Sequence, residues 1–301
     1  MPLFANIDFR IRPADGVDRV DLIGTDSEPY TRVYGSGFTD DRSIEALLRE
    51  LDEHNFVGVM QAEWEDDDPT SVNIRVASAV RDYPEYLIAG VATTDPRRED
   101  GLDVLKHAHD FLGLKGWNFQ PGFLKFSALD EQCQGIFEYC EANGHPVTIH
   151  TGINFSRTGP ISFGHPSNID ALACRYPELK IVCNHGAWPW VTEMLAVLWK
   201  HPQVYADFGA IAPKRMVGPK GGWEPVAHWM NSMVSKQILL ASDWPMMRYA
   251  RLIGELPELG LSAPALENYR RSNAARFIDE VWGTNLVSRI ESSLGETGGA
   301  L

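Results

Sequence analysis

Residues 146–151 read PVTIHT and residues 180–185 read KIVCNH, two short apolar runs that are rich in β-branched residues and end at or near a histidine. An amphipathic stretch with helical spacing of its apolar residues lies between them. A strand, a helix and a second strand in this order form the unit from which parallel sheets are built. The stretch therefore predicts a β-α-β unit.

The same alternation continues in both directions along the chain. The strand-like runs are Ala5–Arg12, Val57–Ala62, Leu87–Thr93, Leu114–Phe119, Pro146–Thr151, Lys180–His185, Val204–Phe208 and Ile238–Ser242. Between the first two, Ile44, Leu47 and Leu51 fall on one face of a helix. Eight such repeats predict a single (β/α)₈ barrel of the TIM type, because no GxGxxG turn follows a strand as it would in an open dinucleotide-binding sheet.

The barrel is expected to span residues 1–291, and the segment 292–301 (SSLGETGGAL) is expected to be a disordered tail. Long connections follow the first, fifth and seventh strands, at Pro13–Arg42, Gly152–Asn168 and Gly209–Trp229. Long loops at the carboxyl ends of barrel strands usually serve as lids and substrate walls.

Composition excludes several classes of function. The net charge of −14 argues against a nucleic-acid partner, which would need a basic surface. We expect a cytoplasmic protein without a membrane partner, since no apolar run approaches the roughly 20 residues of a span and the start lacks a signal core. The four cysteines show no CxxC pairing, so neither disulfides nor a zinc knuckle are expected. The acidic run EWEDDD at residues 63–68 is interpreted as a solvated loop.

Polar side chains stand near the ends of several predicted strands. They are Asp8, Arg10 and Arg12 on the first strand, Lys115 on the fourth, His150 on the fifth, His185 on the sixth and Asp243 on the eighth. Because such groups are costly to bury, their presence there predicts the working site of a barrel. Trp188 follows His185 and is expected to form an aromatic substrate wall.

Several of these segments resemble the amidohydrolase-2 family. They are IDFRIRP (7–13), GLKGW (113–117), TIHTG (148–152), HPSNIDALACRYPELKIVCNHG (165–186), VYADFG (204–209) and ASDWP (241–245). The resemblance implies a metal-dependent hydrolase or a non-oxidative decarboxylase of carboxylated, often aromatic, substrates. It also implies that His150 matches a metal ligand, His185 a ligand or catalytic histidine, and Asp243 the eighth-strand aspartate.

The main departure from the family lies in the first strand. Arg10 and Arg12 stand where the resemblance implies a His-x-His metal-binding pair. A guanidinium offers no lone pair to a metal, so the usual first-strand metal position is expected to be empty. Strand alternation predicts that Asp8, Arg10 and Arg12 all point into the barrel mouth. We expect one arginine to pair with Asp243 or Asp8 while the remaining donors hold a substrate carboxylate; the alternative is that both merely neutralise buried acids.

A divalent metal stays open as a second expectation. His150, His185 and Asp243 together could hold one ion of zinc, manganese or iron, and the sequence does not choose among these metals or between a metal and none. Lys115 is a poor ligand unless modified, so it is expected to contact substrate by its charge.

The favoured function is an enzyme that hydrolyses a C–O or C–N bond of a small carboxylated molecule, with His185 and Asp243 as acid and base and Arg10, Arg12, Lys115 and Trp188 binding substrate. Decarboxylation is the second choice. The competing class is an inert or accessory subunit paired with an active relative, including a metal-dependent oxygenase. A homo-oligomer or such a pair is the expected assembly.

Overall fold

The computed structural model describes residues 4–14, 41–63, 68–154, 159–217 and 222–297. Its strands pair in parallel and in sequence order: β1 (Asn6–Ile11), β2 (Phe56–Gln61), β3 (Leu87–Thr93), β4 (Lys115–Phe119), β5 (Val147–His150), β6 (Ile181–Asn184), β7 (Val204–Asp207) and β8 (Ile238–Leu239). Backbone hydrogen bonds from Phe9 N to Leu240 O (2.8 Å) and from Asp243 N to Arg10 O (2.9 Å) bring the last strand back to the first. The predicted (β/α)₈ barrel is confirmed.

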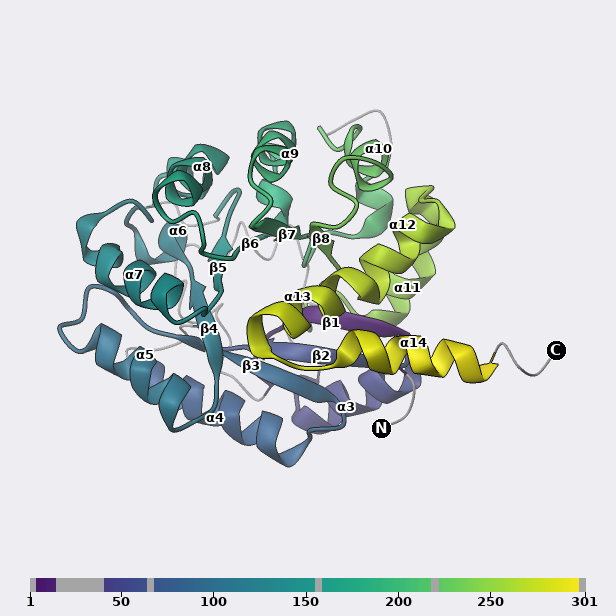
Figure 1. Cartoon of the computed structure of the whole chain (residues 1–301), viewed down its shortest axis with the longest axis horizontal. Helices are drawn as coiled ribbons and strands as arrows, with labels where there is room; N and C mark the ends of the chain where they lie inside the picture. The colour runs from purple at the N-terminus through teal and green to yellow at the C-terminus, as the bar shows by residue number, and fades with distance from the viewer. Residues whose placement is uncertain (1–3, 15–40, 64–67, 155–158, 218–221, 298–301) are drawn as a thin grey trace.

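Helices alternate with the strands and surround them (Figure 1). They are α3 (Ile44–Glu53), α4 (Pro69–Asp82), α5 (Gly101–Asp110), α6 (Pro121–Leu124), α7 (Gln134–Ala142), α8 (Pro166–Arg175), α9 (Val191–Lys200), α10 (Val226–Met230), α11 (Tyr249–Glu255), α12 (Ala263–Glu267), α13 (Asn273–Trp282) and α14 (Leu286–Thr297). The predicted helical face of α3 buries Leu47 and Leu51, and the Ser43 hydroxyl caps the helix by accepting from Ala46 N. Among the described residues, every helix is too short or too polar to cross a membrane.

The inside of the barrel is apolar at the amino ends of the strands. Phe9 packs there edge-on against Phe277 of α13, with ring centroids 5.1 Å apart, and Tyr205 of β7 lies 4.8 Å from the same ring. Val57 and Val182, each the second residue of its strand, join this cluster. These strands lie on different sides of the barrel, so their side chains can meet only in its interior. Because Phe277 of α13 belongs to the same cluster, α13 covers the amino-terminal end of the barrel.

The carboxyl half of the same interior is polar. Gln61, Asn118, Thr148, Asn184 and Asp207 are all buried there, on five different strands. The Thr148 hydroxyl lies 3.0 Å from Gln61 Oε1 and 3.2 Å from Asn118 Oδ1, which links β5 to its neighbour β4 and, across the interior, to β2. Buried polar groups need such partners. This layer forms the floor of the site.

Two features of the chain differ from the sequence prediction. The pairing register between β1 and β2 shifts between Asp8 and Ile11. A bulge of this kind turns successive side chains toward the same face, and Phe9 and Arg10 accordingly both point inward, whereas Asp8 contacts Tyr249 of the outer helix α11. At the other end, α14 continues to Thr297, so the expected tail begins inside a helix; positions 298–301 lie outside the described residues.

Candidate active site

Arg10 is the centre of the site and is buried. Its Nε donates to Asp243 Oδ1 at 2.9 Å, and its Nη1 lies 3.2 Å from both Gln61 Oε1 and Asn184 Oδ1. Its Nη2 pairs with Glu63. One guanidinium thus joins residues on or just beyond β2, β6 and β8, and its planar fork matches these separate acceptors. Neighbouring carboxylates raise the pKa of Arg10 further, against the opposing effect of burial.

Glu63 holds the two arginines together. Its carboxylate pairs with Arg10 through one oxygen and lies 3.0 Å from Arg12 Nη2 through the other, and all three side chains are 2% exposed. The sequence interpretation of residues 63–68 as a solvated loop is therefore wrong for Glu63, while residues 64–67 lie outside the described residues. A run of charged residues indicates an exposed loop only where none of its residues pairs with a buried charge.

His185 begins a tight turn after β6. The residues His185, Gly186 and Ala187 have φ of 62°, 59° and 55°, a left-handed path that is strained for the two residues that are not glycine. Asp207 secures this path by accepting from His185 N at 3.2 Å and from Asn184 Nδ2 at 2.7 Å.

The tautomer of neutral His185 follows from its contacts. The ring Nδ1 lies 2.7 Å from the carbonyl oxygen of Gly209, which can only accept. In the neutral ring Nδ1 therefore carries the proton and Nε2 carries the lone pair. The turn fixes the position of the ring, and the Gly209 carbonyl fixes which ring nitrogen carries the lone pair.

His150 ends β5 beside His185. The centroids of the two imidazole rings are 4.9 Å apart. The Phe123 ring lies edge-on to the His150 ring, with its centroid also 4.9 Å away. His150 is buried, with 7% of its surface exposed. The two histidines therefore form a pair on one side of the barrel mouth.

Asp243 follows β8 in a left-handed conformation, with φ of 55°. Its amide bonds to Arg10 O and its carboxylate to Arg10 Nε, so backbone and side chain both face the first strand. Gly209 leaves room for this approach, since a Cβ there would lie 3.2 Å from Asp243 Cβ and 3.5 Å from Arg10 Cδ. The turns after β7 and β8 are thus packed around the Arg10–Asp243 pair.

Lys115 lies away from this cluster, and the Asp8 side chain is directed to Tyr249 of α11. Lys115 is the first residue of β4, so it stands toward the amino end of the strand and not at the carboxyl end that the sequence interpretation assigned to it. It is close enough to His109 and His145 to lower the pKa of both, together with the larger effect of their burial. Trp188, by contrast, follows the His185 turn and is 36% exposed, at the rim.

The donor set does not fit a metal at the first strand. Arg10 and Arg12 supply no lone pairs, and the Arg10 cation already occupies Asp243 Oδ1. Among the residues that the structure describes, one group of three His, Cys, Asp or Glu side chains has ligand atoms within 4.8 Å of one another, namely Asp170, Cys174 and His201 on the outer helices. His150, His185 and Asp243 are not drawn together in this way.

Comparison with known proteins finds similar chains both in sequence and in structure. In sequence, it is 28% identical over 68 residues to Protein fluG of Emericella nidulans, a match that covers 23% of this chain and 8% of that protein. In structure, an uncharacterized TIM-barrel protein of Bordetella bronchiseptica superposes with a TM-score of 0.76 at 24% identity, covering 92% of this chain and 99% of the other.

Two other solved structures share the fold. A probable 2-pyrone-4,6-dicarboxylic acid hydrolase of Acinetobacter baumannii, with citric acid bound, has a TM-score of 0.63 at 15% identity over 93% of this chain and 100% of that chain. A 5-carboxyvanillate decarboxylase of Novosphingobium aromaticivorans, complexed with manganese and a nitrobenzoic acid, has a TM-score of 0.67 at 15% identity over 92% and 96%. The amidohydrolase family model itself matches residues 38–279, and the chain therefore belongs to the amidohydrolase family.

Proposed function

We propose that this protein is an enzyme that hydrolyses a C–O or C–N bond of a small carboxylated molecule in the mouth of the barrel. The observation that carries the proposal is the buried Arg10–Glu63–Arg12 cluster, which lies on the floor of a site that also presents Asp243 and the two histidines. The citric acid bound by the Acinetobacter baumannii hydrolase supports a carboxylated ligand for a barrel of this shape.

In this proposal Arg10 and Arg12 have different tasks. Arg10 is a fixed cation whose contacts with Asp243, Gln61 and Asn184 hold the floor in place. Arg12 lies two residues further toward the mouth and meets the substrate carboxylate, which joins Glu63 as its counter-charge. Trp188 and Phe123 provide apolar walls.

His185 is the proposed general base. Its Nε2 lone pair takes a proton from the attacking water, and the Gly209 carbonyl stabilises the imidazolium that forms through the Nδ1 proton. Arg12 then stabilises the negative charge that develops on the carbonyl oxygen of the substrate. The proton passes from His185 to the departing oxygen or nitrogen, so the ring returns to its neutral form. His150 lies beside the ring and orients the substrate.

Decarboxylation is the second candidate, favoured by the likeness to the Novosphingobium aromaticivorans decarboxylase. If Arg12 binds the departing carboxylate, as proposed here, it would stabilise the ground state and slow the loss of CO₂, which is why hydrolysis ranks first. A divalent ion held by His150, His185 and Asp243 belongs to this second candidate. It requires these side chains to move closer together, and elemental analysis of untagged protein would reveal it as about one equivalent of zinc, manganese or iron.

The test uses citrate as a binding probe and two compounds as trial substrates, 2-pyrone-4,6-dicarboxylate and 5-carboxyvanillate. Arg12→Lys keeps the charge but loses the two-pronged contact, so citrate affinity by calorimetry should fall about tenfold. His185→Asn should keep citrate affinity and lower kcat by about 10²–10⁴-fold on any compound that is turned over.

His107→Asn on the exposed side of α5 is the matched control and should change neither quantity. Equal citrate binding by the parent and Arg12→Lys would contradict the proposed substrate contact. Absence of turnover by the chain alone, together with copurification of a second protein at fixed stoichiometry, would instead support the accessory-subunit alternative. Self-association of the chain would fit the expected homo-oligomer.

A further inference from the structure

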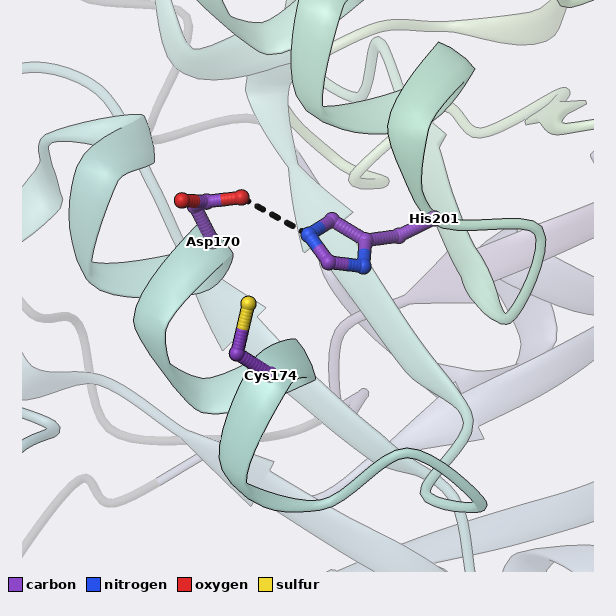
Figure 2. Close-up of side chains that lie close together, drawn as sticks. All are labelled: Asp170, Cys174 and His201. Carbon is purple, nitrogen blue, oxygen red and sulfur yellow. Dashed lines mark hydrogen bonds and ion pairs between the residues drawn. The ribbon is translucent and has the colours of Figure 1, made fainter.

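A second cluster of chemically reactive side chains lies on the outer ring of helices, remote from the barrel mouth. Asp170 and Cys174 lie one turn apart on α8, and His201 directly follows α9. Residues four apart share one face of a helix. Figure 2 shows the three side chains converging from these two helices, and their ligand atoms all lie within 4.8 Å of one another.

The cluster already surrounds a positive charge. Lys200 Nζ lies 2.6 Å from Asp170 Oδ1 and 3.7 Å from Cys174 Sγ, and His201 Nε2 lies 2.7 Å from the same Asp170 oxygen. The hydrogen bonds from Lys200 and His201 lower the pKa of the Asp170 carboxyl. His201 is buried, whereas the Lys200 side chain is 55% exposed and can leave without opening the core.

We propose that Asp170, Cys174 and His201 form a zinc site in which the ion displaces the Lys200 ammonium. One thiolate, one imidazole and one carboxylate are a mixed donor set that suits zinc, and water would complete the tetrahedron. With bonds of about 2.0–2.3 Å, the ligand atoms of such a site stand about 3.4 Å apart. Small rotations of the Asp170 and Cys174 side chains toward the buried His201 cover the difference from the present spacing.

Binding balances its protons as follows. In the metal-free form His201 Nε2 carries the proton that it donates to Asp170, because a carboxylate can only accept. Zinc binds Nε2 of His201 and the sulfur of Cys174. The Nε2 proton therefore moves to Nδ1 or is released to solvent, and the thiol proton is released to solvent. The Lys200 ammonium keeps its proton, and the side chain rotates out into the solvent. Apparent affinity must therefore rise with pH.

The site would tie two parts of the barrel together. The helix α8 follows the loop after His150, and α9 follows the His185 turn, so the ion would bridge the helices behind the two histidines. An ion that binds only the folded chain stabilises it in proportion to its concentration over its dissociation constant. The three ligands lie on or next to the outer helices, whereas the proposed base His185 follows β6 in the barrel mouth, so this role is separate from the proposed hydrolysis.

Cobalt and zinc test the proposal on the full chain. After chelator treatment, Co²⁺ should give a thiolate-to-metal charge-transfer band that Cys174→Ser abolishes, since Cys174 is exposed and Cys133, Cys140 and Cys183 are buried. Calorimetry should show Zn²⁺ affinity falling at least about tenfold in Cys174→Ser and rising in Lys200→Met, which lacks the competing ammonium. Zn²⁺ should also protect Cys174 from alkylation.

His228→Asn, on the exposed side of α10, is the control and should bind both metals like the parent. A cobalt spectrum without the thiolate band, or one unchanged by Cys174→Ser, would overturn the site. A weaker zinc affinity in Lys200→Met would overturn the displacement. Because every readout is binding at Cys174, loss of turnover in the barrel mouth does not affect the result.

Discussion

The Asp8 carboxyl group is fully buried between β1 and α11. It accepts hydrogen bonds from Tyr249 Oη at 2.7 Å, from the backbone of Arg10 at 2.9 Å and Ser242 at 3.1 Å, and from the Ser242 hydroxyl. Burial outweighs these donors and raises its pKa from 3.8 to about 7. Below about pH 7 the neutral form of Asp8 therefore predominates in the folded chain.

This shift has a direct consequence for stability. Since the folded state holds a proton that the unfolded chain releases, the contribution is present below about pH 4 and is lost as pH rises through about 7. Asp8→Asn, which cannot ionise, should flatten the urea stability profile in that window. The difference from the parent should change by on the order of 4 kcal/mol between its ends.

Asp103→Asn is the control for Asp8, because its side chain is 82% exposed. It should give a profile parallel to the parent. If Asp8→Asn also ran parallel to the parent, Asp8 would be ionised throughout, and its hydrogen bonds would outweigh its burial.

The turns after β5 and β6 pack on each other at Gly152. This residue has φ of +82°, and a Cβ there would lie 2.5 Å from Trp188 O and 2.9 Å from the carbonyl carbon of Ala187. Its amide bonds to Gly164 O at 2.8 Å, and the next amide bonds to Trp188 O at 2.9 Å. The position of His150 relative to His185 therefore depends on this glycine.

Gly152→Ala should cost about 3 kcal/mol of unfolding free energy and weaken citrate binding, because the two turns must separate. Gly144→Ala separates strain from packing. Gly144 also has a positive φ, +67°, but a Cβ there would have nothing within 4 Å. That control should cost only about 1–2 kcal/mol and leave citrate binding unchanged. Equal losses in both variants would assign the whole effect to backbone conformation.

The order of strands and helices was predictable because each strand is buried on both faces and reads as an apolar run. Leu87–Thr93 was predicted with the bounds that β3 has, and the other strands differ by a few residues at their ends. The direction in which individual side chains point was harder to predict from the sequence. A bulge in β1 reverses Asp8 relative to Arg10, and a two-residue periodicity contains no signal for a bulge. Lys115 was misplaced because a strand's polar first residue resembles a polar last one.

At the level of the site, the sequence predicts Arg10, His185 and Asp243 as functional residues, whereas it favours a solvated rim loop for Glu63. The contact between Glu63 and both arginines depends on β1 and β2 being neighbours in the barrel. The residues of the acidic run alone contain no information about which strand lies next to them. Whether a charge is solvated or buried depends on its partner in the fold, and the partners of Glu63 lie on or just beyond the neighbouring strand β1.

The same cluster also joins the first strand of the barrel to the last. Arg10 spans from β1 to Asp243 after β8, while the Asp243 amide bonds back to Arg10 O at 2.9 Å. Arg10→Met would leave Asp243 and Glu63 buried beside an apolar side chain. Removing one partner of a buried ion pair costs about 3–5 kcal/mol, so the urea midpoint should fall strongly.

Arg10→Lys should lie between the parent and Arg10→Met, since it keeps the charge but not the fork that reaches Gln61, Asn184 and Asp243 together. Arg81→Met removes an arginine whose pair with Asp82 is exposed, and its midpoint should equal the parent's. Hydrogen exchange should locate the loss of protection in Arg10→Met at β1 and β8. An Arg10→Met chain as stable as the parent would mean that the backbone bonds alone close the barrel and that Arg10 serves the ligand.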